Sequence, residues 1–285
     1  MNSKHPVLDK KETMNIDRPI FIVGPHRSGT TLLYRLLGQH PDVGYFNRMN
    51  HRLRGYPLLS HILTSIRVRG DQPVEAQRIW DRFKYRDDDV MTADDISPEA
   101  IAWFRALVDW VLRLRHADRF LAKYPRLSLR LPWLDALFPG AIFLHMTRDW
   151  RAVVNSMVWR KTKREKREGG WFGVYIPNWR DLESISHEVA SGRIFRFVNL
   201  MLENEASRLG NRFITVSYED LCRNPSGTLR NLSDVCGLRW DKHFAEIIPD
   251  EFKSANFKWR EELDPLIIES IREEDPEFYR RYEKE

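Results

Sequence analysis

The chain has 285 residues, of which 42% are hydrophobic and 31% are charged. This composition is typical of a soluble globular protein and excludes a disordered or fibrous chain. No stretch approaches the roughly 20 apolar residues of a membrane-spanning helix, and residues 1–18 are too polar for the core of a signal peptide. We therefore expect a cytoplasmic protein without a membrane span.

The formal net charge of +5 is compatible with binding to nucleic acid, to a membrane surface or to an anionic small ligand, and charge alone does not choose among them. Basic residues concentrate at positions 160–167. Such a run is typical of a solvated helix end, or of a flexible lip around a cleft that receives an anion. Cys222 and Cys236 lack the spacing of a disulfide framework or a zinc site, so we expect both to be buried.

Short apolar runs, each followed by polar or helix-starting residues, predict four buried strands at residues 20–23, 120–122, 141–146 and 213–216. Helical patterns occupy residues 30–39, 98–116, 127–137, 151–160, 185–208 and 226–236. This alternation predicts an α/β fold with a central, mostly parallel sheet flanked by helices. We expect one domain over residues 19–285, preceded by a flexible N-terminal segment over residues 1–18. Ligands of such sheets bind at the carboxyl ends of the strands.

The first predicted strand leads into residues 24–31, GPHRSGTT, which begin like a phosphate-binding loop and then open a helix. A loop for a nucleoside triphosphate needs Lys and then Ser or Thr after the second glycine, to hold the β- and γ-phosphates and Mg²⁺. Thr30 and Thr31 occupy those positions, and Arg27 is the one strong cation in the loop. The loop therefore favours a phosphate-like anion without a bound metal.

Residues 19–33, PIFIVGPHRSGTTLL, resemble the 5′-phosphosulfate loop of the sulfotransferase superfamily that uses 3′-phosphoadenosine 5′-phosphosulfate (PAPS). The R-S-G-T-T sequence is similar to the tyrosylprotein and bacterial branch rather than to the cytosolic branch, which has K-S-G-T-T. The resemblance implies a P-loop-like fold in which Arg27 stabilises charge on the leaving oxygen. It also implies that the 5′-phosphosulfate is held by Arg27, Ser28, Gly29, Thr30 and Thr31.

Three further segments carry the same resemblance. Arg148 and Ser156, eight residues apart, match the 3′-phosphate motif, and Arg160 lies one helical turn beyond Ser156 on the same face. Tyr218 opens the sequence YEDL, which resembles the segment that contacts adenine. Lys258 belongs to a Lys-Trp element similar to one that closes over the cofactor. Tyr218 as a core residue and Lys258 as a solvated charge remain alternatives.

The catalytic base is less well defined. The resemblance implies that Lys123, after the second predicted strand, supports charge on the sulfuryl group, although a structural ion pair is the alternative. The histidine of the cytosolic branch reads as Pro125, and the glutamate of the tyrosylprotein branch reads as Asn47, whose amide cannot accept a proton near neutral pH. His51 is therefore our candidate base, with His26 as its rival. Asn47 could instead orient an acceptor that is already acidic or already an amine.

The resemblance implies transfer of a sulfuryl group from PAPS to a hydroxyl or amine, which leaves 3′-phosphoadenosine 5′-phosphate (PAP) and requires no metal. The acceptor is a small molecule, a carbohydrate or a peptide, and the sequence does not choose among them or indicate the oligomeric state. A PAP- or PAPS-binding protein with impaired catalysis is one alternative, and a P-loop nucleotide kinase is another. Nucleic-acid binding rests on the basic pI alone and is not expected.

Overall fold

The computed structural model describes residues 16–48, 50, 72–165 and 173–284, and for residues 160–165 it describes the backbone only. The five strands form one sheet with the order β2-β3-β1-β4-β5. Each pair of neighbouring strands is parallel. This sheet confirms the predicted α/β fold. The strands are β1 (Ile20–Val23), β2 (Val43–Gly44), β3 (Arg119–Lys123), β4 (Ile142–Thr147) and β5 (Phe213–Ser217).

The central strand β1 is short and apolar because both of its faces are covered. Phe21 and Val23 point into the core on one face of the sheet. Ile20 and Ile22 point into a second core on the opposite face. Side chains alternate across a strand, so a four-residue run supplies both layers.

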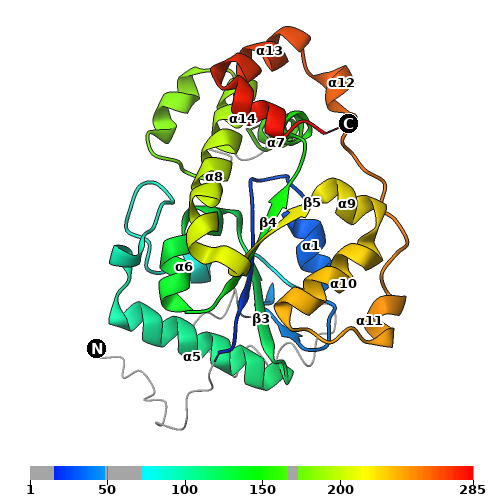
Figure 1. The fold of residues 1–285 in the computed structure, drawn as a ribbon. Helices are drawn as coiled ribbons and strands as arrows, with labels where there is room; N and C mark the ends of the chain where they lie inside the picture. The colour runs from blue at the N-terminus through cyan, green and yellow to red at the C-terminus, as the bar shows by residue number, and fades with distance from the viewer. Residues whose placement is uncertain (1–15, 49, 51–71, 166–172, 285) are drawn as a thin grey trace.

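Figure 1 shows α1, α9, α10 and α11 on one side of the sheet and α5, α6 and α8 on the other. The first layer consists of α1 (Thr30–Leu37), α9 (Tyr218–Arg223), α10 (Pro225–Cys236) and α11 (Lys242–Glu246). The second layer consists of α4 (Gln77–Trp80), α5 (Pro98–Arg115), α6 (Leu131–Leu137), α7 (Trp150–Glu165), α8 (His187–Leu209), α12 (Trp259–Glu262), α13 (Pro265–Glu274) and α14 (Pro276–Arg281). Short 3-10 turns are η2 (Ala93–Asp95), η3 (Pro125–Leu129), η4 (Trp179–Ser184) and η5 (Gly210–Arg212).

The predicted helices are present, with two differences at their ends. The helix expected at residues 127–137 is divided into η3 and α6, and Pro132 stands in the first turn of α6. Residues 218–223, where no helix was predicted, form the helix α9. The hydroxyl of Ser217 caps this helix by accepting a hydrogen bond from the backbone N–H of Asp220 at 3.1 Å.

The residues before β1 contact the domain. Ile16 is buried in the core, and Asp17 forms an ion pair with Arg119. The boundary at residue 18 stays a prediction, since residues 1–15 lie outside the described part of the chain. Cys222 and Cys236 are both buried, as expected. Over the residues that the structure describes, no helix combines the length and the apolar character that crossing a membrane requires.

Candidate functional site

The loop of residues 24–31 joins the carboxyl end of β1 to α1 and is fixed by hydrogen bonds at its base. Gly24 donates its backbone N–H to Oγ of Ser128 at 2.9 Å, and the Ser128 hydroxyl donates to the carbonyl of Gly24 at 3.0 Å. The hydroxyl of Ser28 is fully buried and donates to the carbonyl of Pro25 at 2.8 Å. The side chain of Ser28 therefore stabilises the conformation of the loop from its buried side.

Gly29 stands immediately before α1 and has a φ of 99°, a conformation that favours glycine. A Cβ atom at this position would lie 2.5 Å from Cδ2 of Tyr218, far inside van der Waals contact. The absence of a side chain thus lets the loop pack directly against Tyr218. The backbone at the start of α1 is left accessible, where N–H groups and the helix dipole favour an anion.

Two arginines join this loop to the neighbouring strand β4. Arg27 donates from Nε to the hydroxyl of Ser156 on α7 at 2.9 Å. Arg148, at the end of β4, donates to the carbonyl of Arg27 at 2.8 Å. Its guanidinium carbon lies 4.2 Å from the centre of the Tyr218 ring, a cation–π contact. Arg148 also donates from Nε to the side-chain oxygen of Asn256 at 2.7 Å.

Arg148 is only 7% exposed, so its position is well defined. Burial lowers the pKa of Arg148, whereas Tyr218 and Glu219 oppose that shift. Asn256, which accepts the hydrogen bond from Arg148, is itself held in place because its side-chain amide donates to a carboxylate oxygen of Glu219 at 2.6 Å. The described contacts therefore fix a cation and an aromatic ring next to the loop.

Lys123 ends β3 and reaches the opposite side of the loop. It is 3% exposed, and Nζ donates to Oγ1 of Thr31 at 3.1 Å. The same ammonium group forms an ion pair with Glu75. Burial lowers the pKa of Lys123, and the carboxylate of Glu75 opposes this effect. The ion pair expected as an alternative is present, and it lies beside the loop rather than away from it.

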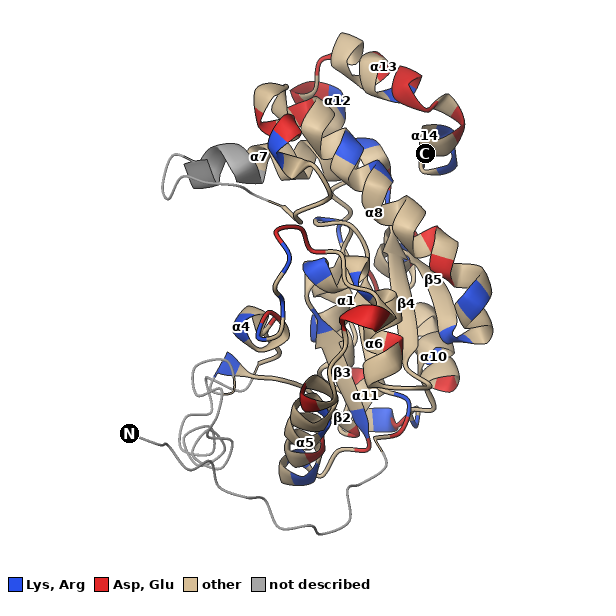
Figure 2. Ribbon diagram, turned by 90° about the vertical axis from the view of Figure 1, so that its left-hand side faces the viewer, with Lys and Arg blue, Asp and Glu red and all other residues tan. Residues whose placement is uncertain are grey.

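A cavity of about 610 Å³ opens at these strand ends, a volume typical of small-molecule and cofactor sites. Figure 2 shows basic residues, drawn blue, between α4 and α7 near α1. Most of the predicted site residues line the cavity, namely Arg27, Gly29, Thr30, Thr31, Lys123, Arg148, Ser156, Tyr218 and Lys258. The structure thus brings together side chains from five separate parts of the sequence, and their binding roles stay predictions.

Three predicted site residues are not placed on the cavity wall. Ser28 is fully buried beneath the loop and does not line the cavity. His51 lies outside the described residues. Arg160 belongs to α7, but its side chain is outside the described part. The binding roles of all three stay predictions.

Asn47 and His26 are the two other residues that the sequence suggested for the acceptor side. Asn47 is 4% exposed and is absent from the cavity wall. Its backbone N–H donates to Oδ1 of Asn50 at 2.9 Å, and its own Oδ1 accepts from the Asn50 N–H at 3.0 Å. This reciprocal pair places Asn47 in a buried turn, and its role toward an acceptor stays a prediction. Burial, together with the charges of Lys123 and Arg126, lowers the pKa of His26 to about 3, which makes it a poor base.

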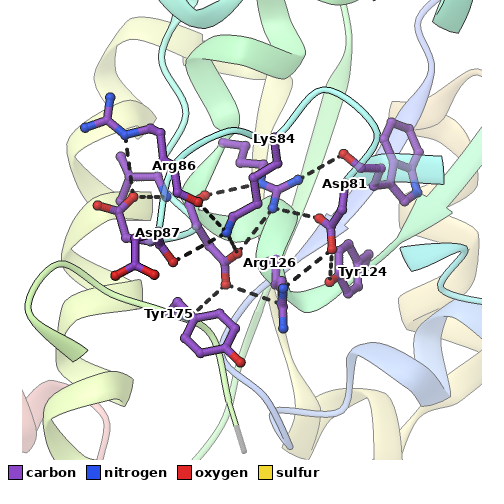
Figure 3. A network of polar contacts seen from close by, with 12 residues as sticks. Asp81, Lys84, Arg86, Asp87, Tyr124, Arg126 and Tyr175 are labelled. Carbon is purple, nitrogen blue, oxygen red and sulfur yellow. Dashed lines mark hydrogen bonds and ion pairs between the residues drawn. The ribbon is translucent and has the colours of Figure 1, made fainter. Parts of the chain in front are cut away.

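One wall of the cavity is part of a polar network, shown in Figure 3. Arg126 lines the cavity and pairs with the fully buried Asp89 at 3.3 Å. Asp89 also pairs with Arg130 at 3.3 Å and accepts from the backbone N–H of Tyr175 at 2.7 Å. Burial raises the pKa of Asp89, whereas the charge of Arg126 opposes that rise. Because each charge in this network has several partners, the wall is held firmly against the loop.

Glu75 and Glu262 are the two carboxylates, among the described residues that line the cavity, that sequence reasoning missed. Glu75 is the one in contact with Lys123. It lies outside every predicted strand and helix. No local pattern marks it, because its position depends on contacts with residues distant in the sequence. The backbone N–H of Val74 donates to the carbonyl of Phe46 at 3.0 Å, which brings the following residue to the cavity.

The fold and the cavity define a P-loop-like α/β protein whose anion-binding loop follows a central parallel strand. A profile of the sulfotransferase family matches residues 19–242, and the chain therefore belongs to this family. This match confirms the resemblance found in the sequence.

Individual relatives agree with this assignment. The chain is 24% identical over 249 residues to protein-tyrosine sulfotransferase A of Caenorhabditis elegans, which covers 83% of this chain and 55% of that protein. It is 26% identical over 242 residues to protein-tyrosine sulfotransferase 1 of Danio rerio, with 82% and 58% covered. The chain thus spans little more than half the length of these relatives. Sulfotransferase STF9 from Mycobacterium avium has the same fold, with a TM-score of 0.61, 14% identity, and 95% and 78% of the two chains covered.

Proposed function

We propose that this protein transfers a sulfuryl group from PAPS to a hydroxyl or amine acceptor and releases PAP. The observation that carries the proposal is the contact between Arg27 and Ser156. It joins the end of the loop after β1 to the helix after β4, so that one cavity holds groups suited to both phosphate positions of the nucleotide. The family membership of the chain supports the same reaction.

The residues of the cavity fit such a donor. At the loop, Gly29, Thr30 and Thr31 line the cavity at the start of α1, where backbone N–H groups favour an anion. Arg148 and Ser156 supply a guanidinium group and a hydroxyl for the 3′-phosphate. Tyr218, already stacked against Arg148, offers one edge of its ring to adenine, and Lys258 at the exposed rim adds a cation for a phosphate.

The charges of the cavity are arranged for group transfer. PAPS supplies the sulfuryl group and a leaving phosphate. Arg27 and the backbone N–H groups at the start of α1 stabilise the negative charge that develops on the leaving oxygen. Lys123 neutralises charge on the sulfuryl oxygens from the other side. Arg and Lys thus perform the electrostatic role that Mg²⁺ has in phosphoryl transfer.

The acceptor would enter on the side of Lys123. Gln77, Arg126 and Trp159 line the same cavity. The related proteins named above are protein-tyrosine sulfotransferases. We therefore propose a tyrosine hydroxyl in a protein or peptide as the first acceptor to test. Small phenols and amines form the comparison panel.

Two measurements test this function. PAP is expected to raise the melting temperature of the protein, as any ligand that binds only the folded state does, and Arg27→Ala is expected to abolish the shift. Transfer of radiolabel from ³⁵S-labelled PAPS to a tyrosine peptide then demonstrates catalysis. Absence of both effects would overturn the proposal.

Two other outcomes separate the alternatives. Binding of PAP without transfer to any acceptor in the panel would support a binding protein with impaired catalysis. Stabilisation by Mg-ATP without a response to PAP would support a nucleotide kinase. A cytoplasmic location stays a prediction, to be checked by fractionation of the source cells.

A further inference from the structure

The segment that precedes α4 runs beside the chain that leaves β2. Asn47 and Pro73 form an antiparallel bridge, and Val74 donates its backbone N–H to the carbonyl of Phe46 at 3.0 Å. The following residue, Glu75, therefore arrives next to the stretch in which the sequence comparison expected a glutamate and found Asn47. A carboxylate is present at this edge of the sheet, but it comes from a different part of the chain.

We infer that Glu75 is the general base that deprotonates the acceptor, an inference that rests on the proposed sulfuryl transfer. The geometry around Lys123 carries it. Nζ of Lys123 contacts both the Thr31 hydroxyl of the loop and the Glu75 carboxylate. Two such contacts place the carboxylate within about 6 Å of the loop hydroxyl. With the donor bound at the loop, an acceptor oxygen at a reactive distance of about 3 to 3.5 Å from the sulfur would be on the same side of the cavity as this carboxylate.

The other cavity groups that accept protons are less suitable. Among the described residues, the only other carboxylate that lines the cavity is Glu262 on α12. Glu262 accepts a hydrogen bond from the side-chain amide of Asn155 on α7 at 2.5 Å. Glu262 also follows Lys258 by four residues, and we assign Lys258 to the nucleotide. His26 also lines the cavity, and burial together with the nearby cations lowers its pKa to about 3. Among the described residues that line the cavity, Glu75 alone combines a carboxylate with a contact to Lys123.

The transfer step balances with these groups. A lone pair of the acceptor oxygen forms the new bond to sulfur as the bond between sulfur and the bridging oxygen breaks. The electron pair of the broken bond stays on the phosphate of PAP, next to Arg27. The proton of the acceptor hydroxyl passes to the Glu75 carboxylate and then to solvent. Lys123 has three N–H donors, and Thr31 and Glu75 use two of them, which leaves the third for a sulfuryl oxygen.

Several charged and titratable groups surround this carboxylate. Lys123 on β3 is its direct partner. Tyr34 on α1 interacts electrostatically with Glu75. Arg27 of the loop and Arg35 of α1 act on the same lysine. A pH profile of the reaction reports on all of these interacting residues together. The test therefore compares the profiles of several variants instead of interpreting the wild-type profile alone.

The experiment uses the full chain with Glu75→Gln, which removes the proton acceptor and keeps the shape. We expect PAP affinity to stay within about threefold of the wild type, whereas kcat with a tyrosine peptide falls by about 10² to 10⁴. The rise of kcat/KM on the acidic side of the pH profile is expected to disappear in Glu75→Gln and to remain in Glu75→Asp. A phenol that is already ionised at the assay pH needs no base, so it is expected to restore turnover in Glu75→Gln.

Glu246→Gln is the matched control, because it removes an exposed carboxylate that pairs with Lys242 at 3.7 Å, away from the cavity. We expect it to behave like the wild type in every assay. If Glu75→Gln keeps kcat within about fivefold of the wild type, or keeps the acidic limb of the profile, Glu75 is not the base. A wild-type protein that binds PAP but transfers nothing would overturn the proposed function itself and the inference with it.

Discussion

Arg27 donates its Nε–H to the hydroxyl of Ser156 at 2.9 Å, although the two residues are 129 positions apart in the sequence. The parallel pairing of β1 with β4 makes this contact possible, because it brings the carboxyl ends of both strands to the same edge of the sheet. Arg148 strengthens the connection by donating to the carbonyl of Arg27 at 2.8 Å. The loop and α7 therefore form one continuous surface at this edge of the sheet.

The first prediction concerns Ser156→Ala. Loss of the hydroxyl removes one hydrogen-bond partner of Arg27 and one donor for the 3′-phosphate. We expect the Kd for PAP, measured by calorimetry, to rise about tenfold, since a hydrogen bond to a charged group contributes about 1.5 kcal/mol. Ser207→Ala, on the exposed face of α8, is the control and should leave the Kd unchanged. Equal Kd values for the two variants would contradict the assignment of Ser156 to the nucleotide.

The second prediction compares two glycines with similar backbone conformations. Gly29 has a φ of 99° and Gly140 a φ of 87°. An added Cβ meets no atom within 4 Å at Gly140, whereas at Gly29 it would collide with the ring of Tyr218. Gly140→Ala is expected to cost about 1 to 2 kcal/mol of stability from backbone strain alone and to leave PAP binding intact.

Gly29→Ala adds the collision to the same strain. We expect a larger drop in melting temperature and at least a tenfold loss of PAP affinity, since Tyr218 must move out of the adenine side of the cavity. Thermal melts with and without PAP measure both effects. Two variants with the same melting temperature and the same affinity would show that the contact between Gly29 and Tyr218 is unimportant.

The fold was predictable where a signal is local. Four apolar runs predicted β1, β3, β4 and β5, because buried parallel strands are apolar on both faces. β2 has only two residues, which is too short for any periodic pattern. α9 was missed because it has only six residues and begins directly at the end of β5, where its cap, Ser217, reads as the last residue of the strand.

The candidate site divides in the same way. Residues 27–31 are contiguous. Arg148 directly follows β4, and Ser156 lies on α7, the next helix, so a short sequence pattern can find all of these residues. Glu75 has no such pattern, since its position follows from the pairing of Asn47 with Pro73 across a stretch of chain. Sequence comparison therefore showed that Asn47 stands where relatives have a glutamate, but it did not identify Glu75 as a neighbouring carboxylate.

The third prediction concerns the polar network behind the cavity wall. Asp89 is fully buried and faces Arg126 and Arg130 at 3.3 Å each. Asp89→Asn removes the negative charge and leaves the buried guanidinium group of Arg130 and the half-buried one of Arg126 without full compensation. We therefore expect the free energy of unfolding to fall by about 3 kcal/mol. Asp87→Asn breaks an ion pair with Arg180 in which both side chains are 63% exposed, and we expect little change. Urea unfolding of both variants measures the difference, and similar losses would contradict it.

The fourth prediction concerns pH and stability. His145 on β4 is 2% exposed, and its Nε2 lies 2.9 Å from Oδ1 of Asn199. Burial lowers the pKa of His145 from 6.5 to about 4, although the hydrogen bond to Asn199 opposes this shift. Between these two values the unfolded chain binds a proton that the folded protein does not, so stability is lost as the pH falls through this range.

We expect this single group to remove about 2 kcal/mol of stability between about pH 7 and about pH 5. His145→Gln cannot titrate, so its stability is expected to fall less steeply than that of the wild type over the same range. The comparison uses the slope of the unfolding free energy against pH, which is insensitive to a constant destabilisation by the substitution. His243→Gln replaces an exposed histidine and should keep the wild-type slope. If His145→Gln also keeps that slope, the buried histidine does not titrate between the folded and unfolded states as its environment requires.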